Sequence, residues 1–280
     1  MNSRDIRETF LSYFEQRGHR RLPSASLVPG PDDTSTLLTV AGMQPFKPYF
    51  LGREQPPAGR VTSCQKCFRT PDIEEVGTTK RHLTCFEMLG NFSFGDYFKR
   101  EAIEFGWQLS IEGFGFDPER VWVTVFGGDE ELGLGPDTEA IEIWRSLGVP
   151  AERIVELPRS ENFWQAGPTG PCGPCSEMYF DRGAEFGPAD ARPGDDTERF
   201  LEYWNHVFMT YNLGADNSLT PLPAKNIDTG LGLERLAAIL QGVDSVFETD
   251  LFKPLIELAE ELSGRRYGES EQATRASDRR

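Results

Sequence analysis

The 280-residue sequence is short of basic residues and has no long apolar run. It contains 29 Lys and Arg against 45 Asp and Glu, which gives a formal net charge of −16. Because phosphate binding depends on concentrated Lys and Arg, this balance argues against a chain that clamps nucleic acid by itself, and it leaves room only for a local basic patch. No window approaches the roughly 18 uninterrupted apolar residues of a membrane helix, and the charged N-terminus lacks the apolar core of a secretory signal. We expect a cytoplasmic protein with no membrane partner.

Cysteine is also scarce, with Cys64, Cys67, Cys85, Cys172 and Cys175 as the full set. An odd number in an expected cytoplasmic protein argues against a disulfide framework. The two C-x-x-C pairs could in principle form a four-thiolate zinc site. The first pair falls in an expected strand, where residues three apart face opposite ways, and the second falls in an expected turn that could chelate. We favour small buried thiols over zinc and assign no metal ligand.

The usual phosphate-binding loops are missing as well. Neither G-x-x-x-x-G-K-[ST] nor a strand-borne G-x-G-x-x-G occurs, and these are the loops whose backbone amides cradle phosphates. If a nucleotide binds to this protein, arginines on strands must hold it.

The sequence does contain many short periodic segments, and its length allows one large domain or two modest ones. Apolar spacing predicts helices at 3–17, 101–113, 137–148, 234–241 and 250–264, and strands at 61–69, 81–88, 121–126, 177–183, 199–212 and from 226. Strands cluster and hairpins recur, without regular βαβ alternation. This order is typical of an α+β domain with an antiparallel or mixed sheet and helices packed around it.

The stretch "NIDTGLGLERLAAIL" has an unusual strand pattern. Asp228, Gly230 and Gly232 alternate with larger residues, so one face of the strand is nearly bare. Glycine inside a strand weakens it and often marks close approach by a ligand or another backbone. Arg235 follows the strand directly, so a carboxylate and a guanidinium stand at the two ends of the bare face. Asp228 taken alone is more simply a turn or capping carboxylate.

A second group of candidates lies on the expected hairpin. Arg69 ends its first strand, and Arg81 and His82 begin the second, so the hairpin brings them together. Guanidinium groups match phosphate geometry with two parallel hydrogen bonds. Phe86 and Met88 share one face of the second strand, at a spacing suited to a flat base. The simpler alternative is a solvated arginine and a core phenylalanine.

Asn205 and Val207 share one face of the strand at 199–212, as Asp228 and Gly230 do on theirs. If these strands are neighbours, they form a small pocket with a carboxylate, an amide, a short apolar wall and bare backbone. Such a pocket suits an ammonium group beside a very small side chain. Trp164 is a further candidate for the pocket wall, and its simpler role is in the core.

Several long motifs resemble one enzyme family. They are "FRTPDIEEVGTTKRHLTCFEMLGNFSFGDYF", "WQAGPTGPCGPCSE", "FLEYWNHVFM" and "NIDTGLGLERL", with "SLVPGPDDTSTLLTVAGMQPFKPYFLG" before them. In order and content they closely resemble the catalytic domain of the alanyl-tRNA synthetases, a family of class II aminoacyl-tRNA synthetases, over residues 3–268. The resemblance implies an antiparallel sheet flanked by helices, with ATP bound in a bent form on the sheet. It also implies Mg²⁺ as cofactor and L-alanine, ATP and the acceptor end of tRNA(Ala) as partners, and it leaves the oligomeric state open.

The resemblance also implies residue roles. Arg69 would contact the α-phosphate and the amino acid carboxylate, and Arg235 the γ-phosphate and the adenine. Phe86 would stack on adenine with Met88 beside the base, and His82 would touch the phosphate tail. The alanine pocket would comprise Trp164, Asn205, Val207, Asp228 and Gly230, with Asp228 pairing with the substrate ammonium and Gly232 keeping the strand face open to ATP. The expected catalytic set is Arg69, Asp228 and Arg235, and Glu87 and Glu202 are weak candidates for Mg²⁺.

Two departures from the family pattern limit the resemblance. The family continues into tRNA-recognition and editing regions, so we expect a catalytic domain at 1–268, a polar tail at 269–280 and impaired transfer and editing. The loop "TPDIEEVG" after Arg69 also lacks a Lys-His pair that many relatives carry there. Two alternatives stay open: a ligase that loads a small amino acid onto an acceptor other than tRNA, and a non-catalytic homologue.

Overall fold

The computed structural model describes residues 1–30, 33 and 35–269. The expected polar tail at 269–280 therefore lies outside the described residues, except for its first residue. No described helix has both the length and the apolarity needed to cross a bilayer.

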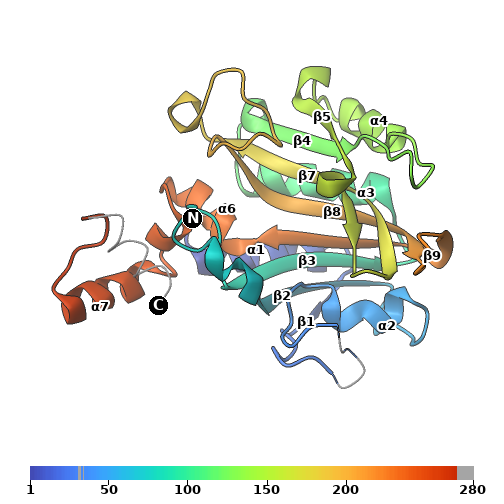
Figure 1. Cartoon of the computed structure of the whole chain (residues 1–280), viewed down its shortest axis with the longest axis horizontal. Helices are drawn as coiled ribbons and strands as arrows, with labels where there is room; N and C mark the ends of the chain where they lie inside the picture. The colour runs from blue at the N-terminus through green and yellow to red at the C-terminus, as the bar shows by residue number, and fades with distance from the viewer. Residues whose placement is uncertain (31–32, 34, 270–280) are drawn as a thin grey trace.

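Within the described part of the chain, nine strands form one mixed sheet in the order β1-β2-β3-β9-β8-β7-β4-β5, with β6 paired to β7 (Figure 1). Their bounds are β1 Arg20–Leu22, β2 Arg60–Phe68, β3 Cys85–Phe94, β4 Val121–Phe126, β5 Ile154–Leu157, β6 Phe163–Gln165, β7 Gly170–Asp181, β8 Phe200–Leu213 and β9 Leu219–Gly232. The pairs β1–β2 and β4–β5 are parallel, whereas the central strands β2, β3, β9, β8 and β7 pair with one another in antiparallel fashion. The α+β prediction with an antiparallel sheet is confirmed for the centre, and the edges make the sheet mixed.

Seven α-helices are found among the described residues. They are α1 Ser3–Glu15, α2 Lys47–Phe50, α3 Lys99–Gln108, α4 Thr138–Ser146, α5 Arg159–Asn162, α6 Leu233–Gln241 and α7 Lys253–Ser263. A π-helical turn, Leu109–Gly113, extends α3, and the short 3₁₀ turns are Gln44–Phe46, Thr70–Glu74, Pro118–Arg120, Ala151–Arg153, Ala184–Phe186 and Val246–Glu248.

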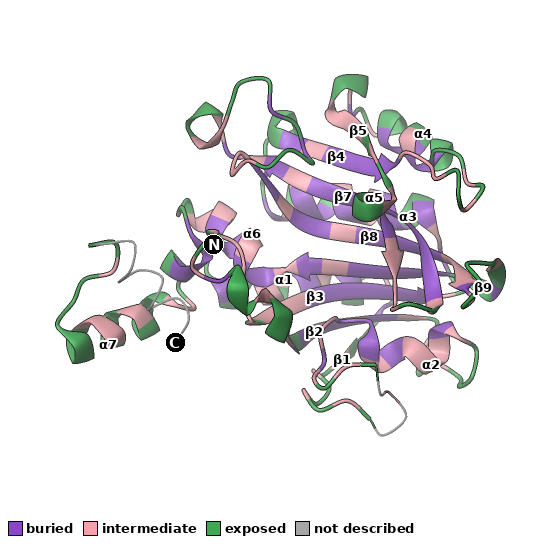
Figure 2. Ribbon diagram, viewed as in Figure 1, coloured by how far each residue is buried: buried purple, intermediate pink, exposed green. Residues whose placement is uncertain are grey.

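The main core lies between one face of the sheet and helices α1, α3, α4 and α6. The four-residue spacing of Ile6, Phe10 and Phe14 gives α1 an apolar stripe, and all three side chains are fully buried against the sheet. On the strands, alternation sends Trp204 and Phe208 of β8 into the same core. Figure 2 shows the result as nearly continuous burial along the central strands, while α7 has no buried residue and lies away from the sheet.

The five predicted helices and six predicted strands are present, but several boundaries differ. The second hairpin strand begins at Cys85, so Arg81 and His82 precede the strand instead of beginning it. "GPCGPC" belongs to β7 and is not a turn. An irregular register between Cys172 and Cys175 accommodates its prolines and glycines within the strand. The sequence reasoning also missed β1, β5, β6, α2 and α5, all of which have at most four residues.

The topology excludes a zinc site built from both C-x-x-C pairs. Cys64 and Cys67 lie on β2, whereas Cys172 and Cys175 lie on β7, and β3, β9 and β8 separate these strands. Burial raises the pKa of the Cys67 thiol to about 12, which disfavours the thiolate that a metal needs. Among the residues the structure describes, no cluster of three His, Cys, Asp or Glu side chains is arranged to hold a metal ion.

Candidate active site

The candidate residues surround one cavity of about 380 Å³ over the central strands. It opens on the sheet face opposite the α1–α3 core, and segments from β3, β9, β8, β7 and β6 line it. All eleven residues that the sequence analysis assigned to the alanine and ATP sites are in its lining: Arg69, His82, Phe86, Met88, Trp164, Asn205, Val207, Asp228, Gly230, Gly232 and Arg235. The structure therefore brings together residues that lie up to 166 positions apart in the chain.

Strand register explains why the small-pocket residues converge. Asn205 of β8 pairs with Gly230 of β9, and Val207 pairs with Asp228 two positions further along. Directly paired residues of neighbouring strands project from the same face of a sheet. The amide, the short apolar wall, the carboxylate and the bare backbone therefore lie side by side, as predicted from the alternation.

The bare face of β9 allows a close approach by the neighbouring strand. A Cβ at Gly230 would lie 2.9 Å from the Sδ of Met88 on β3. The intervening Thr229 points the other way, where its hydroxyl donates to Asn91 and is fully buried. Glycine at position 230 thus keeps space beside Met88 for a ligand.

Asp228 is the most unusual group in the cavity. It is only 6% exposed, and its carboxylate makes no hydrogen bond or ion pair with any described residue. Burial without a partner disfavours the charged form, and it raises the pKa of Asp228 to about 7. A cation bound beside this carboxylate would stabilise its charged form. Acids with such raised pKa values concentrate at functional sites.

Arg69 and Arg235, both in the cavity lining, come from different elements. Arg69 follows β2, and its Nε donates to the carbonyl oxygen of Val40 at 2.9 Å, while no hydrogen bond joins its terminal nitrogens to another described residue. Its guanidinium carbon lies 5.0 Å from the ring centre of Phe86. Arg235, in the first turn of α6, is paired through Nη1 with the Glu202 carboxylate at 2.6 Å.

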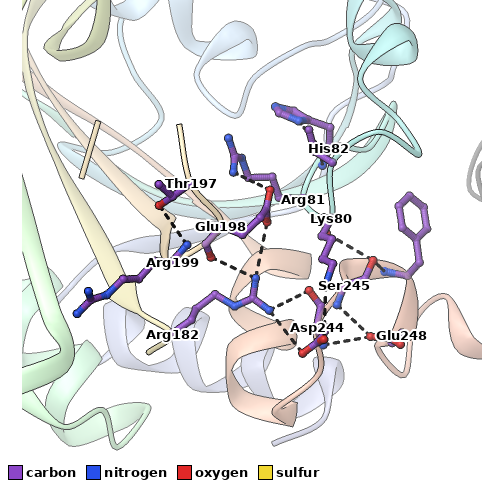
Figure 3. Close-up of polar contacts among 12 residues, drawn as sticks. Lys80, Arg81, His82, Arg182, Thr197, Glu198, Arg199, Asp244, Ser245 and Glu248 are labelled. Atoms are coloured by element: carbon purple, nitrogen blue, oxygen red, sulfur yellow. Dashed lines mark hydrogen bonds and ion pairs between the residues drawn. The ribbon is translucent and has the colours of Figure 1, made fainter. Parts of the chain in front are cut away.

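A network of ion pairs fixes the segment before β3 at the cavity mouth (Figure 3). Arg81 pairs with Glu198, which also pairs with the nearly buried Arg182. Arg182 reaches Asp244, and its Nη2 donates to the Asp244 carbonyl oxygen at 2.9 Å. His82 hydrogen-bonds through Nδ1 to the hydroxyl of Thr79 at 2.7 Å, outside this network. Burial, with Arg235 and Arg81 nearby, lowers the pKa of His82, which favours the neutral ring.

Four carboxylates in the lining were missed or undervalued by the sequence reasoning: Asp72, Glu177, Glu202 and Glu234. Glu202 reaches the cavity because the register shifts near Tyr203, where Met178 pairs with Trp204 but Tyr179 pairs with Glu202. Simple alternation would have placed Glu202 and Asn205 on opposite faces. Glu177 shares a strand face with Tyr179, and this alternation could have marked it as a site residue. The predicted strand began at Glu177, however, which placed this residue at the strand end and not in its interior.

Glu87 does not belong to the site. It alternates with Phe86 and Met88 on β3 and so faces away from the cavity, where it forms an ion pair with Arg7 of α1. Its oxygen also accepts a hydrogen bond from the Cys64 thiol at 3.2 Å. The weak assignment of Glu87 as a Mg²⁺ candidate is therefore wrong.

Comparison with known proteins identifies the family of this chain. The family described as tRNA synthetases class II (A) matches residues 5–279. The chain belongs to this family. The solved structures of a histidyl-tRNA synthetase from S. aureus (12% identity, TM-score 0.50, 86% of this chain and 66% of that one) and an aspartyl-tRNA synthetase from Entamoeba histolytica (13%, 0.50, 89% and 56%) share its fold.

The similar sequences are more specific. An alanine–tRNA ligase of Rubrobacter xylanophilus is 55% identical over 285 aligned residues, which cover 99% of this chain and 32% of that protein. A probable chloroplastic/mitochondrial alanine–tRNA ligase of Ostreococcus tauri is 54% identical and covers 95% of this chain and 26% of its own length. These relatives confirm the resemblance seen in the motifs. The chain spans about a third of the length of the relatives it matches.

Proposed function

We propose that this chain activates L-alanine with ATP in the cytoplasm, forming alanyl-adenylate and pyrophosphate, and that the alanyl group is then passed to the acceptor end of tRNA(Ala). One observation carries the proposal: two arginines and one unpartnered buried acid surround a single cavity with a bare strand face as its floor. We assign the activation step to a catalytic domain at residues 1–268.

The amino acid end of the cavity suits alanine. Asp228 would accept the substrate ammonium, which would relieve the unfavourable burial of its charge. Val207 and Trp164 would bound the methyl group, and Gly230 leaves space for the backbone of the amino acid. A methyl pocket rejects glycine and serine poorly, because one methylene contributes only about 1–3 kcal/mol.

The ATP end is built on charge and stacking. Arg69 would contact the α-phosphate and the alanine carboxylate, and Arg235 the γ-phosphate side, with His82 near the phosphate tail. Phe86 would stack on adenine beside Met88, and Gly232 leaves the strand open beneath the nucleotide. The alanine carboxylate is ionised at pH 7 and attacks the α-phosphorus directly while pyrophosphate leaves. Positioning and charge stabilisation are therefore sufficient, and no general base is required.

Glu202 is the residue that fits a Mg²⁺ ion bound with ATP. Mg²⁺ in nucleotide sites takes one or two carboxylates besides the substrate phosphates. Glu202 lines the cavity, its side chain is 31% exposed, and Arg235 already orients it. When bound, Mg²⁺ supplies positive charge that neutralises the phosphate oxygens.

The direct test is ATP–pyrophosphate exchange dependent on alanine, with glycine and serine for comparison. Arg69→Ala is expected to lower exchange about 100- to 1000-fold, the usual cost of one lost charge contact to the transition state. Arg100→Ala is the matched control, because Arg100 is exposed and its one ion pair within the described part of the chain is with Glu104 on its own helix. Near-normal exchange in Arg69→Ala, with an unchanged melting temperature, would refute the assignment.

Charging of tRNA(Ala) then separates the remaining possibilities. Exchange followed by charging supports both steps of the proposal. Exchange without charging is the result expected of an activation domain whose transfer step is impaired. Exchange followed by loading of a different acceptor favours the second candidate, a ligase with another acceptor, which the net charge of −16 makes physically reasonable. No exchange with any amino acid favours the non-catalytic homologue.

A further inference from the structure

Glu177 lies beside the small-amino-acid pocket and has no role in the activity described so far. Its Cα pairs with that of Asn205, which in turn pairs with Gly230, so the three residues form one row across β7, β8 and β9. Glu177 is 8% exposed and lines the cavity. Both of its oxygens are used: Oε1 accepts from Asn205 Nδ2 at 2.9 Å, and Oε2 accepts from the Tyr179 hydroxyl at 2.7 Å.

The hydrogen bond from Asn205 to Glu177 fixes which end of the Asn205 amide faces Glu177. An ionised carboxylate can only accept hydrogen bonds, so it selects the NH₂ end of the amide. The other end of the amide, Oδ1, is buried and has no hydrogen-bond partner among the described residues. A buried acceptor without a donor costs free energy. Because Gly230 has no side chain and Asp228 lies two residues before it on β9, a ligand donor in the pocket can satisfy both Asn205 Oδ1 and the Asp228 carboxylate.

We propose that Glu177 is a positioning residue that fixes the amide of Asn205 so that Oδ1 accepts a hydrogen bond from the ammonium group of the small amino acid. The inference rests on the proposed function and adds to it the residue that orients the amide of Asn205, which already belongs to the proposed alanine pocket. Glu177 itself acts through Asn205 and does not touch the substrate.

The electrostatics of the row are consistent with this role. Burial, and then the charge of Glu202, raises the pKa of Glu177 to about 8, while Tyr179 and Arg235 act in the opposite direction. A substrate ammonium between Asn205 and Asp228 adds a positive charge that favours the ionised form. Amine binding and the acceptor-only state of Glu177 therefore stabilise each other.

The test uses one variant to reverse the direction of the hydrogen bond between residues 177 and 205, and a second variant to restore an acceptor facing the ammonium. In Glu177→Gln, the introduced amide can accept from Tyr179 and donate to Asn205 Oδ1, which turns the NH₂ of Asn205 toward the ammonium. The KM for alanine in pyrophosphate exchange is expected to rise about 10- to 100-fold, the equivalent of one charge-assisted hydrogen bond. The KM for ATP is expected to stay within about twofold.

The double variant Glu177→Gln/Asn205→Asp provides the rescue. The introduced amide donates to one oxygen of the introduced carboxylate, and the other oxygen faces the ammonium. Most of the alanine affinity is expected to return, although Asn205→Asp alone places two carboxylates in contact and binds alanine worse than the wild type. Glu156→Gln, on the exposed surface of β5, is the control for loss of one negative charge.

The outcomes separate this inference from the proposed function. Wild-type protein without exchange for any amino acid overturns both. Active wild type with an unchanged alanine KM in Glu177→Gln overturns the inference alone, as does a double variant no better than its worse parent. If Glu177→Gln does not fold, the double variant decides, because it keeps one carboxylate in the row: near-wild-type alanine KM supports the inference, and lost alanine binding overturns it.

Discussion

Asp228→Asn is expected to make the unliganded protein more stable at high pH while abolishing alanine-dependent exchange. The side chain is 6% exposed and its carboxylate has no polar partner in the described structure. Asparagine has the same shape and carries no charge that must be buried. The substitution thus removes an unfavourable group from the empty site and, with it, the group proposed to bind the substrate amine.

The magnitude follows from the pKa of Asp228, which burial raises from 3.8 to about 7. A difference of about three pKa units is worth at most about 4 kcal/mol, at about 1.36 kcal/mol per unit. Because the folded-state pKa is the higher one, the folded protein retains a proton that the unfolded chain has lost between about pH 4 and 7. Wild-type stability therefore falls as pH rises through this window.

The measurement is urea unfolding of wild type and Asp228→Asn at about pH 5 and pH 8. The stability advantage of the variant is expected to be small at the lower pH and to grow by about 2–4 kcal/mol at the higher pH. Glu177 and Glu234 also have raised pKa values of about 8, but both proteins contain them, so their contributions cancel in the difference. An advantage that does not change with pH would refute the reasoning.

Two further predictions concern glycines. In Gly230→Ala, the new Cβ would lie 2.9 Å from the Sδ of Met88; because a methionine end can move, stability is expected to change by less than about 1 kcal/mol. Exchange with alanine should fall more than exchange with glycine, and an unchanged ratio of the two would contradict a pocket at this position. In Gly106→Ala, helix propensity alone predicts stabilisation by about 1 kcal/mol, but the new Cβ would lie 2.4 Å from Nε2 of the fully buried His206. Unfolding is therefore expected to show destabilisation by about 1–3 kcal/mol, and a more stable variant would show that α3 and β8 are not so closely packed.

The sequence predicted the central elements well because their periodicity is strong. Ile6, Phe10 and Phe14 fix the buried face of α1, and the alternation in "NIDTGLG" fixes which side chains of β9 face the cavity. It failed where pairing partners, not local pattern, determine structure. "GPCGPC" looks like a turn by composition, yet its residues pair with β8 and β6 on either side, and tertiary pairing overrides the local preference.

In the candidate site, too, local alternation predicted some residues, and others depended on strand pairing. Residues whose strand alternation could be read locally, such as Asn205 and Asp228, were placed on the correct face before any pairing was known. Glu202 could not be placed, because the register shift at Tyr203 turns it to the cavity face. Glu177 could not be recognised as a site residue, because its proposed role depends on its hydrogen bond to Asn205 on the neighbouring strand. A single sequence shows which residues share a face, but not which residues of different strands stand opposite each other.

The two faces of the sheet have opposite energetic characters, and this has consequences for both stability and activity. The face toward α1, α3 and α6 is apolar and closely packed, so it provides most of the favourable burial. The cavity face holds Asp228, Glu177 and Glu234, three buried carboxylates whose raised pKa values show that their charges are unfavourable there. Such groups are tolerated only because the other face supplies the stability, and they become favourable only when a cation enters. Changes on the cavity face should therefore impair binding more than folding, whereas changes on the helix face, such as Gly106→Ala, should impair folding first.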